Sequence, residues 1–261
     1  MIEMKSDDQK TIESFLSDFV NHITAEFPTE IDYILLAGSA ARGDFVCGQS
    51  DLDLGIRVKK QDDVETIREK ALDLFWKLNE KHGVKFDLLS EKNKSKKPFS
   101  VYGPLGRTKQ NNLFSLLEPL HGFNRSLLVN TAHSGKILYG RNIMPELIER
   151  AKPRNAFQML NRYSFILSLL NLPLFFISPD KALSSSIRKV ISSFEDRIFS
   201  SENDHDPNVV FAKKALHAKK HFDEIRKQWS YLDKFLFCFR APIAIAHDAI
   251  KKSSAYYSRK K

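Results

Sequence analysis

The sequence predicts an α+β fold, in which a domain with a small mixed sheet is followed by an all-α helical bundle. In the first half, some segments repeat apolar residues with a helical period and others alternate them as strands do. All ten glycines of the 261-residue chain lie between Gly38 and Gly140, and none follows. Because glycine supplies the positive-φ turns that sheet loops need, its absence predicts helices with short polar connections. We expect the two domains to span residues 1–142 and 143–261.

The first half reads as helices and strands in the order expected of a small α/β unit with a mixed sheet. The segment over 9–27 has Ile12, Phe15 and Phe19 at helical spacing. The segment over 62–83 begins with acidic residues and ends at Gly83, as helices often do. The predicted elements are a helix over 9–27, a strand over 32–37, a glycine-rich loop over 38–50, a strand over 51–58, a helix over 62–83, a strand over 84–90, a polar basic loop over 91–110, and a helix followed by a short strand within 124–142.

The second half is predicted to be helical throughout, with four stretches near 143–172, 181–200, 207–229 and 231–258. Its most apolar run extends from Phe165 to Ile177 and contains Pro173. This run is too short to cross a bilayer, so we interpret it as a buried helix that ends at the proline and expect no membrane association. A helical bundle is the simplest arrangement of these stretches.

Composition and charge place the chain among folded soluble proteins, with 42% hydrophobic and 28% charged residues. The N-terminus shows no secretory leader pattern, and two cysteines exclude a disulfide framework. We therefore expect a cytoplasmic protein. The net charge of +9 belongs to the second half, because residues 1–150 hold 21 basic and 22 acidic side chains whereas residues 151–261 hold 20 and 10. A basic half suits a phosphate-rich partner, although solvated lysine-rich helices give the same count.

The chemistry of the chain is concentrated in the stretch GSAARGDFVCGQSDLDLGI, residues 38–56. Side chains alternate across a strand, so Asp51 and Asp53 lie on one face of the second predicted strand. Two adjacent carboxylates repel each other unless a cation is bound, and Mg²⁺ prefers one or two carboxylates together with phosphate oxygens. Gly38 permits close approach of a phosphate to the backbone, and Ser39 offers a hydroxyl.

Two further side chains extend this constellation. Arg42 offers a planar fork of donors for a triphosphate, and Asp87 is a third carboxylate on a strand that could pair beside Asp51 and Asp53. The loop is not a Walker loop, since no Gly-Lys-Ser/Thr follows at the required spacing.

The combination of Gly38-Ser39, an eleven-residue gap, Asp51-x-Asp53 and a later aspartate resembles the nucleotidyltransferase superfamily with the DNA polymerase β-like fold. The string GSAARGD…SDLDL is similar to minimal nucleotidyltransferases and to relatives with a following helical domain, such as the aminoglycoside nucleotidyltransferases. The resemblance covers residues 30–90 strongly and 123–142 weakly. It implies a polymerase β-like nucleotidyltransferase domain followed by a helical bundle that binds substrate or a partner.

The resemblance also implies roles for individual residues. Asp51, Asp53 and Asp87 would bind two Mg²⁺ ions, for which Mn²⁺ could substitute, and Gly38 and Ser39 would hold the β- and γ-phosphates. Arg42 and Ser50 are further expected nucleotide contacts. The implied reaction moves a nucleoside monophosphate from an NTP, with ATP the expected donor, to an acceptor hydroxyl and releases pyrophosphate.

Several alternatives stay open. The acceptor could be a small molecule, a protein hydroxyl or RNA, and we allow for a homodimer. One rival is a catalytically inactive or antitoxin-like module that uses the same fold for binding. Another is an RNA-binding or RNA-cleaving protein that acts through the basic helical half, where Arg240 and His247 resemble the Arg-x4–6-His signature of HEPN domains.

Overall fold

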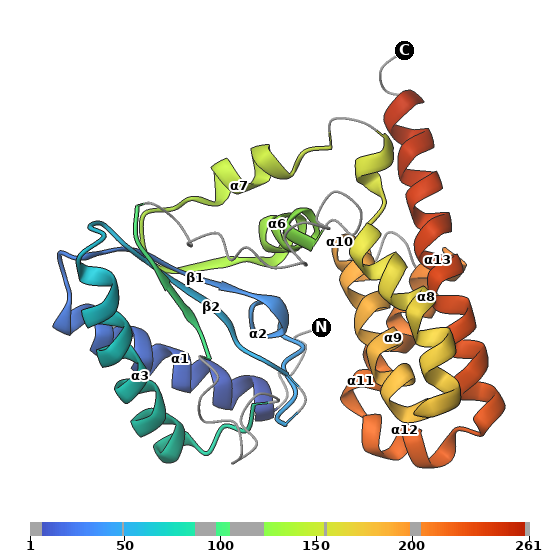
Figure 1. Ribbon diagram of the computed structural model, residues 1–261, viewed down its shortest axis with the longest axis horizontal. Helices are drawn as coiled ribbons and strands as arrows, with labels where there is room; N and C mark the ends of the chain where they lie inside the picture. The colour runs from blue at the N-terminus through green and yellow to red at the C-terminus, as the bar shows by residue number, and fades with distance from the viewer. Residues whose placement is uncertain are drawn as a thin grey trace. The chain divides into compact units, whose positions relative to one another are not determined.

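The computed structural model describes residues 7–48, 50–86, 98–104, 123–153, 156–198 and 205–258 (Figure 1). The chain divides into two compact units, each with a core of its own. The first unit comprises residues 1–110 and 134–148, and the second comprises residues 111–133 and 149–261. The chain therefore passes between the units three times. The boundary expected at residue 142 stays a prediction.

The first unit is built on a four-stranded sheet with the strand order β3-β2-β1-β4. The strands are β1 (Ile31–Ala37), β2 (Asp53–Val58), β3 (Ser100–Tyr102) and β4 (Lys136–Gly140). β1 runs antiparallel to β2 and β4, whereas β2 and β3 are parallel. The predicted mixed sheet is thus confirmed.

Two helices, α1 (Asp7–Glu26) and α3 (Asp63–His82), cover one face of this sheet (Figure 1). Leu54, Ile56 and Val58 alternate along β2 and are buried beneath them. Phe15 of α1 meets Phe75 of α3 edge to face, with ring centroids 5.1 Å apart. Each such side chain contributes roughly 1.5–3 kcal/mol when it is fully buried. Asp53 at the start of β2 is exposed, on the opposite face of the strand.

The edge of the sheet beside β2 differs from the sequence prediction. Residues 84–86 form no strand, although Val84 and Phe86 are buried in the core, and residues 87–90 lie outside the described residues. β3 instead forms within the segment expected to be a loop, with Ser100 opposite Gly55. Only Val101 of this three-residue strand is buried, so its apolar pattern is too short to be read from sequence.

The second unit is helical, as predicted. Its helices, of which α7 begins in the first unit, are α6 (Phe123–Ser134), α7 (Met144–Ala151), the 3-10 helix η2 (Ala156–Met159), α8 (Arg162–Ile177), α9 (Pro179–Ser193), α10 (Glu195–Ile198), α11 (Pro207–Lys220), α12 (Phe222–Gln228) and α13 (Tyr231–Ser258). The core lies between α8, α9, α11 and α13, where Phe175, Ile187 and Ala241 are almost fully buried.

Several helix predictions in this half are wrong. The stretches expected over 181–200 and 207–229 are each divided in two, the first into α9 and α10 and the second into α11 and α12. The single stretch expected over 143–172 is divided, because α7 ends at Ala151, shortly before Pro153, and a proline disfavours helix at the residue before it. α8 continues through Pro173 to Ile177. Pro173 lies on the exposed side of the helix, where water can satisfy the carbonyl group that loses its hydrogen bond.

The apolar run in α8 is also less buried than expected, since Phe176 is 71% and Ile177 83% exposed. Within the described parts of the chain, no helix has both the length and the sustained hydropathy that crossing a membrane requires.

Candidate active site

The predicted site lies where β1 ends and β2 begins. Ala37, the last residue of β1, pairs with Asp53, the first residue of β2. The chain then turns directly into α2 (Gly38–Arg42), a single helical turn in the segment expected to be an irregular loop. This turn places Gly38 next to the Asp53 carboxylate.

Gly38 meets Asp53 so closely that only glycine fits. Its φ of +66° lies in the left-handed region, and an added Cβ would collide with Asp53 Oδ2 and lie 3.1 Å from Asp53 Cγ. Any other residue at this position would strain the left-handed backbone and would collide with the Asp53 carboxylate. The backbone at the start of α2 thus packs directly against the Asp53 carboxylate.

Ser39 is buried, and its Oγ makes no hydrogen bond within the described residues. Its carbonyl oxygen accepts hydrogen bonds from the N–H groups of Gly43 and Asp44, at 3.0 and 3.1 Å. A buried hydroxyl without a partner costs free energy, and a ligand oxygen at α2 would supply the missing partner.

Arg42 is held by Asp44 rather than extended toward the site. Its Nε lies 2.9 Å from Asp44 Oδ1, and the two side chains are only 11% and 1% exposed. The ion pair fixes the end of α2 where Gly43 reverses the chain with a φ of +90°. Asp44 was missed as a structural partner, and the expected contact of Arg42 with a triphosphate stays a prediction.

Asp51 and Asp53 are both exposed. The residue before them, Ser50, is buried, and its Oγ accepts a hydrogen bond of 3.0 Å from the N–H of Val46. Ser50 N–H donates in turn to the Val46 carbonyl oxygen at 3.0 Å. Ser50 therefore closes the spacer that leads into the two aspartates, and its expected contact with the nucleotide stays a prediction.

The third predicted carboxylate, Asp87, lies outside the described residues. Within the ranges that the structure describes, no three His, Cys, Asp or Glu side chains gather as a metal site. The described part of the site therefore offers the pair Asp51 and Asp53 as ligands.

Helix α1 anchors this region through two contacts that sequence reasoning missed. Asp8 Oδ2 accepts a hydrogen bond of 2.9 Å from Cys47 N–H, and Gln9 Nε2 donates to the carbonyl oxygen of Ala40 at 3.2 Å. Burial raises the pKa of the Cys47 thiol, and the neighbouring Asp8 carboxylate raises it further. Both contacts join residues far apart along the chain, so no pattern of neighbouring residues could predict them.

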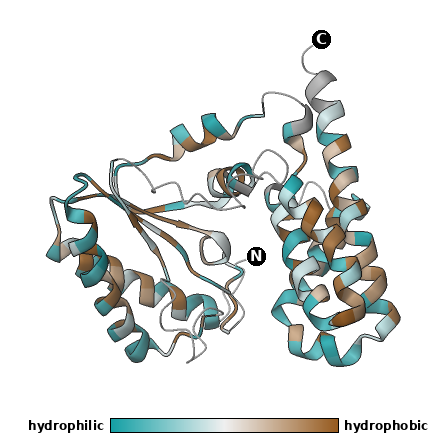
Figure 2. Cartoon of the chain, in the orientation of Figure 1, coloured by the Kyte–Doolittle hydropathy of each residue, from teal (hydrophilic) through white to brown (hydrophobic). Residues whose placement is uncertain are grey.

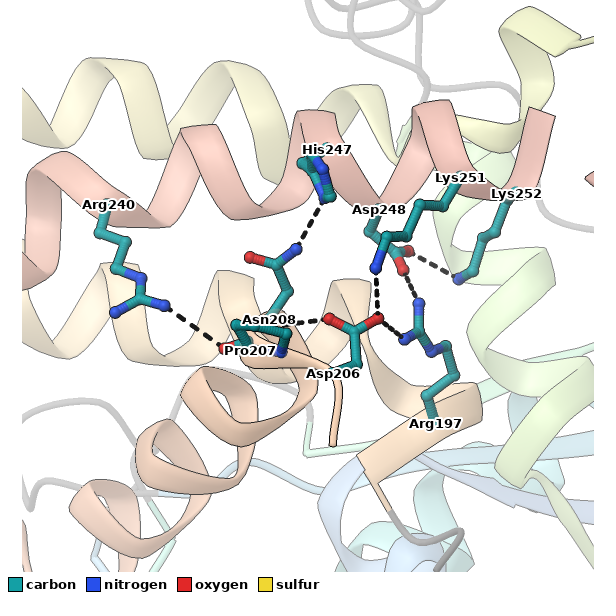
Figure 3. A network of polar contacts seen from close by, with 9 residues as sticks. All are labelled: Arg197, Asp206, Pro207, Asn208, Arg240, His247, Asp248, Lys251 and Lys252. Carbon is teal, nitrogen blue, oxygen red and sulfur yellow. Dashed lines mark hydrogen bonds and ion pairs between the residues drawn. The ribbon is translucent and has the colours of Figure 1, made fainter. Parts of the chain in front are cut away.

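The two residues of the HEPN-like signature lie on α13, in the second unit (Figure 3). Arg240 donates a hydrogen bond of 3.3 Å to the Pro207 carbonyl oxygen, and its guanidinium lies 4.7 Å from the ring centroid of Phe211. His247 Nδ1 lies 2.8 Å from Asn208 Nδ2. Both side chains thus contact α11, although both are exposed.

The fold and the site together are those of a polymerase β-like domain, in which a Gly-Ser turn meets the Asp53 carboxylate at the end of a mixed sheet. Comparison with known families supports this class, because residues 17–114 match the family model described as "Nucleotidyltransferase domain". The chain therefore contains a nucleotidyltransferase domain, and the resemblance seen in the sequence is confirmed for this part. A search of the curated proteins found no match to the chain.

Proposed function

We propose that this protein transfers a nucleoside monophosphate from an NTP to an acceptor hydroxyl and releases pyrophosphate. The observation that carries the proposal is the contact between the Gly38 backbone and the Asp53 carboxylate, beside Ser39, whose Oγ has no hydrogen-bond partner among the described residues. A phosphate group bound at α2 would therefore lie next to the Asp53 carboxylate, as nucleotidyl transfer requires.

The β- and γ-phosphates are assigned to Gly38 and Ser39. Gly38 has no side chain to exclude a phosphate, and Ser39 Oγ can donate to a phosphate oxygen. A hydrogen bond to a charged group contributes about 1.5–3 kcal/mol. These residues would hold the pyrophosphate both before and after it leaves.

The residues present fit a divalent cation. Asp51 and Asp53 offer the oxygen ligands that Mg²⁺ prefers, and phosphate oxygens would complete the coordination. We propose that two Mg²⁺ ions, or Mn²⁺ ions, bind there with Asp87 as the third ligand. When bound, Mg²⁺ supplies positive charge that favours ionisation of the acceptor hydroxyl and offsets the charge of the leaving pyrophosphate.

The acceptor is assigned to the β3 side of Asp53. In an in-line displacement the acceptor oxygen bonds to the α-phosphorus opposite the bond to pyrophosphate that breaks. Gly38 follows β1, so the pyrophosphate lies on the β1 side of β2 and the acceptor on the β3 side. The ring of Tyr102 lies there against Gly55, where an added Cβ would come within 3.3 Å of it.

Thermal unfolding with Mg²⁺ and each of the four NTPs tests the site. A ligand at one hundred times its Kd stabilises the native state by about 2.7 kcal/mol. We expect ATP with Mg²⁺ to raise the unfolding temperature, and Asp51→Asn and Asp53→Asn to abolish the rise. Asp73→Asn, at an exposed position of α3, is the matched control and should respond as the wild type does. A wild type that responds to none of the four NTPs would contradict the proposal.

The rival interpretations make different predictions. An inactive binding module would be stabilised by the nucleotide but would release no pyrophosphate with any acceptor. If the basic helical half is the working part, an RNA-cleaving activity would survive Asp53→Asn and be lost in His247→Ala.

A further inference from the structure

Helix α13 exposes a row of large apolar side chains to solvent. They lie on five of its turns, and each is about half exposed or more: Leu232 62%, Leu236 52%, Phe239 49%, Ile243 55% and Ile250 67%. The opposite side of the same helix is buried in the core of the second unit, where Phe237, Cys238 and Ala241 are at most 5% exposed. α13 is therefore apolar on two faces, and the described residues cover one of them. Figure 2 shows apolar residues along this helix.

The exposed row has the spacing of a coiled coil. With Ala246, the positions Leu232, Leu236, Phe239, Ile243 and Ile250 follow each other at intervals of four, three, four, three and four residues. This is the alternation that lets two helices pack side by side over many turns. We call these six residues the α13 seam. It extends for about 27 Å at 1.5 Å per residue, and its spacing favours another helix as its occupant.

A groove runs beside the α13 seam. It encloses about 450 Å³ between α11 and α13, and Leu236, Phe211 and Val210 contribute to its apolar walls. Asp233 and Arg240 of α13 line the same groove. Side chains of an occupant could therefore enter it while their helix lies along the seam.

We propose that a second copy of this chain docks on the part of the α13 seam from Leu232 to Ile243, with its own α13 antiparallel. Asp233 and Arg240 are both exposed and lie one heptad apart on the same edge of the seam. In an antiparallel pair, equivalent edges face each other, so Asp233 of each copy lies near Arg240 of the other and two ion pairs form. In a parallel pair, the edge with Asp233 and Arg240 would face the opposite edge of the partner's seam. That edge holds Phe235, Pro242 and Ala249, which carry no charge.

The neighbouring helix enlarges the surface available for the dimer. Phe176 of α8 is 71% exposed and lies 6.1 Å, between ring centroids, from Phe235 of α13. Leu170 and Ile177 of α8 are also exposed. A stable interface covers roughly 800 Å² on each partner, and isolated monomers rarely leave a continuous apolar patch of this kind open to water. This inference is independent of the proposed reaction.

The mass of the full chain in solution, measured by size-exclusion chromatography with light scattering, tests the proposal. We expect a dimer for the wild type and a monomer for the double variant Leu236→Glu, Ile243→Glu. The unfolding temperature of the double variant should stay close to that of a diluted, monomeric wild type, because both side chains are more than half exposed. Ile148→Glu, at a 49% exposed position of α7, should remain dimeric. A monomeric wild type at high concentration, or a double variant that stays dimeric, would overturn the proposal.

Disulfide trapping tests the antiparallel arrangement. In a Cys47→Ser background, Leu236→Cys lies near the middle of the paired helices and should cross-link two copies. Ile250→Cys should not, since the pairs of Asp233 with Arg240 centre the two helices between residues 236 and 237 and leave the two copies of Ile250 about 40 Å apart along the helix axis. Efficient cross-linking through Ile250→Cys, as a parallel pair would give, overturns the arrangement.

Discussion

The chemistry proposed for this protein depends on how Gly38 meets Asp53. The first residue of β2 pairs with the last residue of β1, and the residue after β1 lies against the Asp53 carboxylate. At that position the backbone has a positive φ and leaves no space for a side chain. Gly38 thus follows the paired strand β1, begins α2 and leaves room for a phosphate to approach the backbone.

Replacing Gly38 by alanine should eliminate stabilisation by Mg²⁺ and nucleotide, because the methyl group would displace the Asp53 carboxylate. We also expect a loss of about 1–2 kcal/mol in folding free energy from the left-handed backbone alone. Gly43→Ala is the matched control, since Gly43 has a φ of +90° and nothing within 4 Å of an added Cβ. It should show the backbone cost and retain nucleotide binding. Equal loss of binding in both variants would assign the effect to backbone strain rather than to the carboxylate.

Ser39→Ala should separate binding from stability. Because Ser39 Oγ makes no hydrogen bond within the described residues, its removal should leave the unfolding temperature unchanged or slightly higher. The loss of a hydrogen bond to phosphate should raise the KM for the NTP by about ten- to a hundredfold. Steady-state pyrophosphate release and thermal unfolding measure the two effects. A destabilised variant with an unchanged KM would mean that the hydroxyl serves the fold.

At the scale of single residues, the sequence could predict the features that a repeating pattern of side chains encodes. The expected strand over 51–58 begins only at Asp53, so Asp51 lies before β2 and its shared face with Asp53 stays a prediction. The alternation of side chains along a strand did predict the buried face formed by Leu54, Ile56 and Val58. It could not predict the ion pair of Arg42 with Asp44, because the one-turn helix α2 that brings them together has no period to detect. The hydrogen bond between Asp8 and Cys47 joins residues 39 positions apart, which no local pattern encodes.

At the scale of elements, a buried ionic network joins α10, α11 and α13 in the second unit (Figure 3). The Arg197 guanidinium pairs with both Asp206 and Asp248. Asp206 also caps α11 by accepting a hydrogen bond of 2.9 Å from Asn208 N–H and pairs with Lys251 at 3.0 Å. Although burial opposes it, the Asn208 N–H, Arg197 and Lys251 hold the pKa of Asp206 well below its ordinary range.

The low pKa makes the stability of this network depend on pH. A carboxyl group whose pKa is lower in the folded state stabilises the fold above its unfolded pKa of about 3.9 and loses this contribution as the pH falls toward the folded value. Asp206→Asn keeps a residue that caps helices but removes the charge. We expect a loss of about 3 kcal/mol at neutral pH that shrinks as the pH falls below about 4. Urea unfolding of both proteins at a series of pH values measures it, and a difference that did not change with pH would contradict the assigned role.

The long elements were the predictable ones. α1, α3 and α13 each run for at least 20 residues with one face buried, so their apolar period is repeated several times. β3 and η2 have three and four residues, too few to show a period. The continuation of α8 beyond Pro173 was missed because proline usually ends a helix, and whether the lost hydrogen bond is tolerated depends on which side of the helix meets water.

At the scale of the whole molecule, the two units are interleaved along the chain. β4 belongs to the first unit and the preceding helix, α6, to the second. Arg125 of α6 donates hydrogen bonds of 2.9 and 2.6 Å to the carbonyl oxygens of Arg150 and Ala151. Asn130 donates to Ser192 Oγ at 2.6 Å. The helical unit therefore includes a segment that precedes the last strand of the sheet.

Cutting the chain at the boundary expected from sequence should expose this interleaving. A fragment of residues 143–261 lacks α6, so the carbonyl groups at the end of α7 and the hydroxyl of Ser192 lose these partners. We expect it to unfold at lower urea concentration than a fragment of residues 123–261, by about 2–3 kcal/mol if each lost hydrogen bond contributes about 1 kcal/mol. Equal stability of the two fragments would show that the division at 142 separates independent domains.

The central claim is that the α-phosphorus of an NTP is transferred at Asp51 and Asp53. ATP labelled at either the α- or the γ-phosphorus, incubated with Mg²⁺ and a mixture of small molecules, proteins and RNA, tests it most directly. We predict that the α-label becomes covalently attached to an acceptor and the γ-label is released as pyrophosphate, and that Asp53→Asn prevents both while Asp73→Asn does not. Transfer of the γ-label to an acceptor, or transfer of the α-label that persists in Asp53→Asn, would contradict the account.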